Sequence, residues 1–468
     1  MSEATPRKFA ESKSIQQKIL TIFMKMISYA NGYQWFALCL LLTGSVLQAQ
    51  ITDYQHLTLQ KAIEIGLIQN KKIKISHLKD EMSETQEKDL KMEKLPDVEF
   101  HTSYNQVTNL FQHEDGVFAK ATKYNIINGM YDFTLSASIP VYMGGKIKNT
   151  EKKAAIDTEI SSLKTHLNER QLKMEIITAF LQIHHLKEQQ RLINDKIKED
   201  SVNIKQVKAL KENGVVTVNE VLRTSLQLSN HKMSRTELDN DIQIAEHKLK
   251  TMLSLSENQE MHAETENLIS ENAEIPYINE LTETALHKNE SVEIANKNLT
   301  LKELDQKIAK ANYLPKITAG GEYFLKYPNM MFFPPEPYAY RLGMIGINLT
   351  YPIENLYKNK YKMQEAKENI TLARLQIEEN EENIRHEVYE AFKKFEETEQ
   401  KVIIAEEAIN QAKENYRIVK TKYANKLSLI TELIDADNAY LEAQSNLISV
   451  KINRQLKYYQ LQYTIGNL

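Results

Sequence analysis

The feature that most constrains this chain is that its sequence is written twice. Residues 214–224 resemble residues 426–436, and the two segments are 212 positions apart. The aligned pairs at the start of these segments include Glu220 with Glu432, Val221 with Leu433 and Leu222 with Ile434. A Leu-Pro step ending at Pro96 also recurs at Pro315, at a spacing of 219. We therefore predict two copies of one structural unit.

The composition is typical of long helices. Charged residues make up 26% of the 468 residues, and there are only 13 glycines and 10 prolines. No run of eighteen apolar residues occurs in the body of the chain, so no membrane-spanning helix is expected there. The formal net charge of −4 gives no indication of nucleic-acid binding.

The N-terminal segment, 1–49, is predicted to be a signal peptide. An apolar core at 35–42 follows Lys25, and the small residue Ala49 marks the expected cleavage site. Cys39, the single cysteine of the chain, lies inside that core. The mature chain would then contain no cysteine, which excludes a thiolate metal site or a cysteine nucleophile.

Two segments show the period-two alternation of β-hairpins with one apolar and one polar face, at about 97–142 and about 316–351. The apolar positions of the first hairpin are Val98, Phe100, Tyr104, Tyr131, Phe133, Leu135, Ala137, Ile139 and Val141. Such a face suits lipid, while the polar face suits a water-filled lumen. Four tyrosines near the second hairpin are candidates for an aromatic girdle: Tyr323, Tyr327, Tyr338 and Tyr340.

Long helical patterns follow each hairpin. Residues 146–213 contain neither proline nor glycine, and a helix of that length would span about 100 Å. Each long helix is predicted to turn back on itself, with tips near 214 and near 426. Single helices over about 57–93 and 277–312 are expected to precede the hairpins.

These elements divide the chain into a first repeat at 50–255, a polar linker at 256–276 and a second repeat at 277–468. Each repeat supplies two strands, which gives four per chain. A four-stranded sheet in lipid leaves two edges with unsatisfied backbone groups, at a cost of several kcal/mol per group. The sheet must therefore close with copies of itself, and eight, twelve or sixteen strands all remain possible.

Several local motifs occur in the same order as this duplicated plan. They are Leu57-Thr-Leu-Gln-Lys-Ala62, Leu95-Pro96, Ile139-Pro-Val-Tyr-Met-Gly-Gly-Lys146, and Gly214-Val-Val-Thr-Val-Asn-Glu-Val-Leu222 with its second copy. With them, nearly all of the mature sequence resembles the TolC family of outer-membrane efflux proteins. One departure is Lys426, where the family often has glycine.

The resemblance implies a mixed fold. It would be a homotrimer with a twelve-stranded β-barrel in outer-membrane lipid, continued by a periplasmic α-helical barrel of twelve coiled-coil helices. It also implies a passive exit duct of a tripartite efflux or type I secretion system. The partners would be a periplasmic adaptor (membrane fusion) protein and an inner-membrane transporter.

Two sets of site residues follow from the same resemblance. Acidic residues at the positions of Glu432 and Asp435 would ring and constrict the periplasmic entrance, and six carboxylates in a trimer would attract cations. The spacing of three places both on one helix face. The adaptor-docking tips would be Gly214, Val215, Val216, Thr217, Lys426, Leu427 and Ser428. A solvated helix face and ordinary helix turns are the simpler readings of these residues.

The alternative function is a soluble periplasmic coiled-coil scaffold with no channel. An enzyme is not expected, because His386-Glu387 lacks the second histidine of a zinc-protease motif and the other histidines have no ligand spacing. No cofactor is expected. A diffusion porin would not need about 100 Å of helix in each arm.

Overall fold

The computed structural model describes residues 57–256, 261–264, 276–332 and 334–468, all within one compact unit, Tyr54–Leu468. The predicted signal peptide lies outside these residues, as does most of the linker. Within the described ranges, no helix is both long and apolar enough to cross a membrane.

The two repeats contain the same sequence of elements. The first comprises α3 (Leu59–Gln69), α4 (Lys71–Met92), β1 (Asp97–Gln106), β4 (Gly129–Tyr142), α5 (Lys146–Glu212) and α6 (Val218–Met252). The second comprises α7 (Ile278–Lys288), α8 (Glu290–Ala311), β5 (Lys316–Tyr327), β6 (Tyr340–Thr350), the short α9 (Asn355–Lys358), α10 (Lys360–Ala424) and α11 (Ile430–Thr464). A small hairpin, β2 (Leu110–Gln112) with β3 (Thr122–Tyr124), lies in the connection between β1 and β4.

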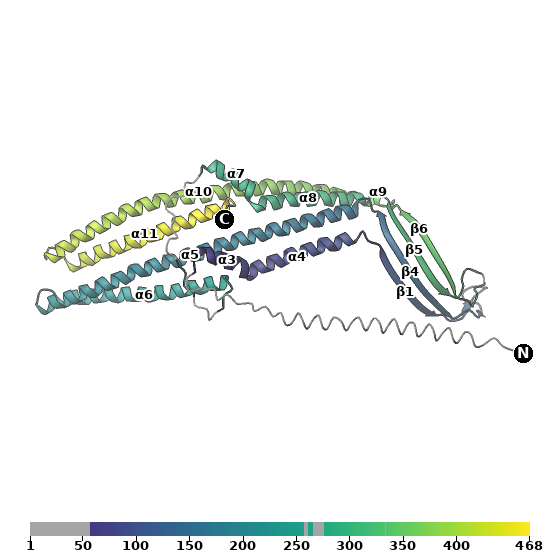
Figure 1. Cartoon of the computed structure of the whole chain (residues 1–468), viewed down its shortest axis with the longest axis horizontal. Helices are drawn as coiled ribbons and strands as arrows, with labels where there is room; N and C mark the ends of the chain where they lie inside the picture. Colours follow the sequence, from purple (N-terminus) through teal and green to yellow (C-terminus); the bar gives the residue numbers. More distant parts are fainter. Residues whose placement is uncertain (1–56, 257–260, 265–275, 333) are drawn as a thin grey trace, which may run out of the picture. The chain divides into compact units, whose positions relative to one another are not determined.

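One antiparallel sheet joins the repeats. Its strand order is β1-β4-β5-β6, so β4 of the first repeat pairs with β5 of the second. The outer strands β1 and β6 each have one unpaired edge in the chain. The helices leave from one end of the sheet, and the hairpin loops lie at the other end (Figure 1).

Strand register places the apolar residues on one face. Directly opposed residues share a face, and one row across the sheet consists of Phe100, Leu135, Tyr323 and Gly343. The neighbouring rows on this face contain Val98, Ala137, Gly321 and Ile345, and then Thr102, Phe133, Leu325 and Arg341. The large apolar side chains of this face are exposed; Ile345 is 96% exposed.

One girdle candidate lies on the other face. Tyr340 pairs with Lys326, one position away from the row that contains Leu325, and its ring packs edge-on against Phe324 at 5.7 Å. Phe324 is only 4% exposed, although its face of the sheet is otherwise largely polar. Tyr340 therefore lies on the opposite face of the sheet from Tyr323 and Tyr327, because side chains alternate along a strand. These tyrosines do not form one row.

The two helices expected before the hairpins are each broken. Asn70 separates α3 from α4, and Asn289 separates α7 from α8. Both asparagines have extended ψ angles, of 130° and 119°, and both accept a hydrogen bond from the backbone N–H two residues ahead. An asparagine side chain can thus end one helix and cap the next without a proline or glycine.

The helices pack as long antiparallel pairs. α5 contacts α4 and α6, and α10 contacts α8 and α11, while α5 also contacts α11 of the other repeat (Figure 1). The largest apolar core among the described residues lies where α3, the start of α4, α5 and α6 meet, and its fully buried side chains include Ile73, Ile176, Phe180 and Leu249. Met261 and Ala263, from the segment predicted to be a polar linker, also lie in this core.

Gly144 fixes the junction between β4 and α5. Its φ angle is +65°, and a Cβ added there would lie 2.8 Å from the backbone oxygen of Ala311. Ala311 ends α8 of the second repeat. A glycine is therefore required both by the backbone conformation and by the close approach of the other repeat.

Candidate functional site at the helical tips

The two helical tips have the same backbone conformation. Gly214 has a φ angle of +72°, and Lys426, its counterpart in the second repeat, has a φ angle of +62°. A left-handed residue is the usual way to end a long helix before a tight turn. Lys426 adopts this conformation despite its Cβ, so the departure from glycine leaves the turn type unchanged.

Glutamates occupy the third position of both helices that start at the tips. In α6, Glu220 accepts a hydrogen bond from the backbone N–H of Thr217 at 3.4 Å, which forms half of a capping box. In α11, Glu432 accepts a hydrogen bond from the Ser428 hydroxyl. Each carboxylate also lies near the positive end of its helix dipole.

The structure places Glu432 and Asp435 on the exposed face of α11. The next two residues, Ala436 and Asp437, are buried. Both proposed gate residues therefore point away from the packed face of the helix, as a spacing of three predicts. No ion pair joins either of them to another described residue.

The tips also expose apolar side chains. Leu427 is 76% exposed, and Val215, Val218 and Leu429 are exposed as well. Apolar side chains at the end of a long helical hairpin lie where a partner would meet the chain first.

A buried polar cluster lies two helical turns above the second tip. Its members, which we call the inter-repeat cluster, are Lys196, Glu199, Gln227, Tyr416, Lys420 and Asp437. Lys196 forms an ion pair with Asp437, and the side chains are 6% and 10% exposed. The other Asp437 oxygen accepts a hydrogen bond from Gln227 at 2.9 Å. These contacts join α5 and α6 of the first repeat to α11 of the second.

Glu199 extends the cluster to α10. It accepts hydrogen bonds from the Tyr416 hydroxyl at 2.8 Å and from Lys196 and Lys420 at 2.9 and 3.3 Å. Burial alone would raise the pKa of Glu199, but these donors and the Lys196 charge outweigh burial and lower the pKa to about 2. Burial and the bond to Glu199 raise the pKa of the Tyr416 hydroxyl. The carboxylate is therefore ionised at neutral pH.

A second link joins the tips themselves. The Tyr423 hydroxyl, at the end of α10, donates a hydrogen bond to Glu220 of α6 at 2.9 Å. Burial and this carboxylate raise the pKa of Tyr423 to about 12. Glu220 therefore both caps its own helix and holds the neighbouring repeat.

Sequence reasoning identified the tips and missed the inter-repeat cluster. Lys196, Glu199 and Asp437 look like ordinary charged residues of an exposed helix face, because only the packing of α5 against α11 buries them. A signal was available for Asp437, which follows two residues after Asp435 and therefore lies on a different face of the helix.

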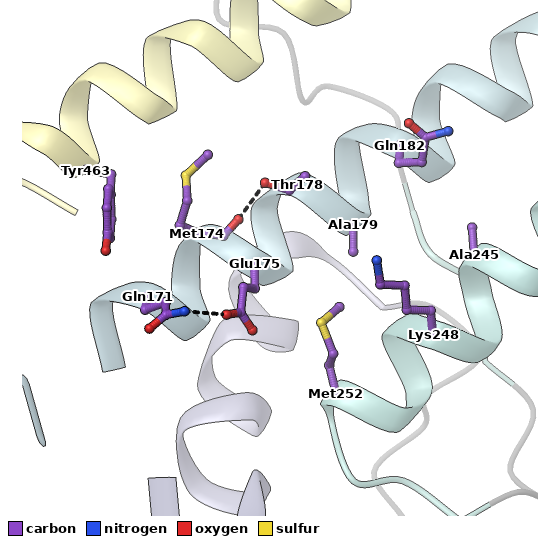
Figure 2. A pocket seen from close by; sticks show the side chains of 10 residues that line it. All are labelled: Gln171, Met174, Glu175, Thr178, Ala179, Gln182, Ala245, Lys248, Met252 and Tyr463. Carbon is purple, nitrogen blue, oxygen red and sulfur yellow. Dashed lines mark hydrogen bonds between the residues drawn. The ribbon is translucent and has the colours of Figure 1, made fainter. Parts of the chain in front are cut away.

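Another groove lies far from the tips (Figure 2). Its volume is about 630 Å³, and it is lined by α5 and α6 with Tyr463 of α11. Met174 and Met252 flank it, and Glu175 accepts a hydrogen bond from Gln171 at 2.9 Å on its wall. Thr178 donates a hydrogen bond to the backbone oxygen of Met174 within α5, and Lys72 of α4 lies 3.9 Å from Glu175. These contacts tie side chains of the helices to one another and bring no catalytic group into the groove.

The profile of the family described as "Outer membrane efflux protein" matches the chain twice, over residues 68–254 and 281–467. The chain therefore belongs to the outer membrane efflux protein family. The double match also confirms the internal repeat. No curated protein sequence matches the chain.

Solved structures share the fold at low sequence identity. The outer-membrane channel OprN has a TM-score of 0.72 at 15% identity, covering 88% of this chain and 90% of its own. CusC has a TM-score of 0.73 at 13% identity, covering 89% and 93%. The outer membrane protein VceC from Vibrio cholerae has a TM-score of 0.71 at 14% identity, covering 87% and 96%. These channels have the same arrangement of sheet and long helices as this chain.

The protein is thus an outer-membrane efflux duct with a large periplasmic helical extension, as its family membership shows. This result favours the duct over the alternative of a periplasmic scaffold.

Proposed function

We propose that three copies of the chain close into a twelve-stranded barrel continued by a helical barrel, and that the assembly conducts substrates passively without enzymatic activity. The observation that carries this proposal is the sheet. It has two unpaired edges and one exposed apolar face, and both features require partners in lipid. Pairing of β6 with β1 of the next copy satisfies the edges, and lipid covers the face.

The gate of this duct would lie at the second tip. Glu432 and Asp435 are exposed on α11, and three copies would bring six carboxylates around one axis. A ring of carboxylates attracts cations and repels anions. The inter-repeat cluster and the Tyr423–Glu220 bond would hold the two hairpins of each copy together, so the aperture would depend on them.

The tips would dock the periplasmic adaptor protein, with the inner-membrane transporter beyond it. The docking residues are Gly214, Val215, Val216, Thr217, Lys426, Leu427 and Ser428. The exposed side chains of Val215 and Leu427 and their place at the end of both hairpins support this assignment. A cross-linking scan with cysteines at these positions tests it: efficient cross-links to the adaptor are expected at the tips and not on the middle of α10.

The gate is tested by recording single channels of the detergent-purified protein in planar bilayers. We expect small, cation-selective steps, and we expect Glu432→Ala with Asp435→Ala to enlarge them and reduce cation selectivity. A matched control removes Glu379 and Glu382, which are exposed on α10 with the same spacing. Reversal potentials that stay unchanged in a salt gradient would exclude these carboxylates as the gate. Folded protein that forms no channel would contradict the duct.

A further inference from the structure

Three tyrosines form a continuous row at the loop end of the apolar face. Tyr104 is directly opposite Tyr131 in the register, and Tyr131 is directly opposite Tyr327. Their ring centroids are 5.0 and 5.8 Å apart. We call these three residues the tyrosine row. Tyrosine suits the boundary between lipid and water, because the ring is apolar and the hydroxyl is polar.

Arg341 lies one step inward on the same face. It pairs with Leu325, which in turn pairs with Phe133. Among the described residues whose register places them on this face of the sheet, Arg341 is the only charged one. Its side chain is exposed and has no ion pair or hydrogen bond with another described residue.

On the opposite face of the sheet, the neighbouring lysine has an acidic partner. Lys326, the neighbour of Leu325 along β5, points to the polar face and pairs with Asp132 at 3.0 Å. Lys326 is thus neutralised on the face where water would be available. Arg341 has no acidic partner on the face that would meet lipid.

An unpaired arginine in lipid is tolerated only near the interface. The cost is largest at the bilayer midplane and falls to almost nothing near the headgroups. Arg341 is the second residue of β6, directly after the hairpin loop. Successive residues on one face are about 7 Å apart along a strand, which an arginine side chain can span to reach the level of the tyrosine row.

We propose that Arg341 and the tyrosine row bind the phosphate of a phosphorylated glycolipid of the outer leaflet. This inference rests on the proposed function, because the loop end of the sheet faces outward only if the helices extend into the periplasm. A guanidinium matches a phosphate through two parallel hydrogen bonds. The tyrosine rings would lie along the acyl chains, with their hydroxyls at the level of the sugar.

The test is native mass spectrometry of the assembled protein in an uncharged detergent, titrated with lipid A. One basic residue near a membrane surface is worth roughly a fivefold change in lipid affinity. Arg341→Gln is therefore expected to bind lipid A about fivefold more weakly than the wild type. Arg341→Lys should retain part of the affinity. Lys326→Gln, which removes one charge at the same height on the other face, should bind like the wild type.

Lipid controls separate the chemistry from its possible sources. Dephosphorylated lipid A should bind the wild type no better than intact lipid A binds Arg341→Gln. The proposal is overturned if Arg341→Gln binds normally, if Lys326→Gln loses as much affinity, or if phosphatidylglycerol binds equally well with the same dependence on Arg341. A channel that conducts normally in bilayers while showing any of these results would leave the proposed function intact.

Discussion

Removal of the buried ammonium of Lys196 should release the two hairpins from each other. Lys196 and Asp437 are 6% and 10% exposed, so solvent screens their pairing little. Loss of one partner from a buried ion pair costs about 3–5 kcal/mol, because the other charge remains buried without compensation. Lys196→Met should therefore disfavour the packed arrangement of α5 against α11 by roughly that amount.

A free energy of 3–5 kcal/mol corresponds to a change of roughly 10² to 10³-fold or more in the population of separated hairpins. We expect Lys196→Met to show larger single-channel conductance, or more frequent large openings, than the wild type. The assay is a planar bilayer recording on protein whose helical content and oligomer size match those of the wild type.

Two further variants serve as controls for this prediction. Lys198→Met removes a lysine from an exposed pair with Asp195 on the same helix, where the side chains are 78% and 64% exposed, and it should change little. Lys196→Met with Asp437→Leu replaces both charges by apolar groups, and it should restore the small conductance. The reasoning is refuted if Lys196→Met conducts like the wild type, or if the double variant stays as open as the single one.

Three other perturbations have defined outcomes. Acidification should weaken the inter-repeat cluster. The lowered pKa of Glu199 contributes stability that is present above pH 4.5 and is lost as the pH falls towards 2. Channel openings to large conductance should therefore become more frequent between pH 4.5 and 2, and this increase should be smaller in Glu199→Gln. The carboxylate is about a third exposed, so the effect is expected to be only about 1–2 kcal/mol. Both tips turn through a left-handed residue, so Lys426→Gly should stabilise the second tip by about 1 kcal/mol and Gly214→Ala should destabilise the first by a similar amount. Thermal unfolding measures both effects. Equal melting temperatures for the two variants and the wild type would argue against left-handed turns. Gly144→Ala should destabilise by more than Gly214→Ala, because its Cβ also meets the Ala311 backbone oxygen at 2.8 Å; a milder effect in urea unfolding would contradict that contact.

Local sequence patterns predicted the strands and the long helices, because these elements depend on residues close together in the chain. Alternation assigned Phe133 and Leu135 to one face, and the absence of proline and glycine predicted the long α5. The same local reasoning missed the breaks at Asn70 and Asn289, because asparagine is only mildly unfavourable within a helix and the sequence does not show which asparagines cap a new helix.

The candidate site divides in the same way. The two tips could be predicted because the duplication aligns Gly214 with Lys426 and Glu220 with Glu432. The gate role of Glu432 and Asp435 came from the family resemblance and stays a prediction. The partners of Lys196 could not be predicted, since Asp437 lies 241 residues away and only the docking of one repeat on the other brings them together. Burial of a charge is a property of the assembled helices, and a single helical pattern shows only on which face a residue such as Asp437 lies.

The asparagine breaks have a mechanical consequence for the helical wall. α5 and α10 run the full length of the helical part, whereas α4 and α6 lie along successive stretches of α5, and α8 and α11 lie along successive stretches of α10 (Figure 1). At each level along the helical part, the chain therefore contributes two continuous helices, α5 and α10. It also contributes two rows made of shorter helices, which meet end to end near Asn70 and Asn289. Bending of the helical part should therefore concentrate at the level of Asn70 and Asn289.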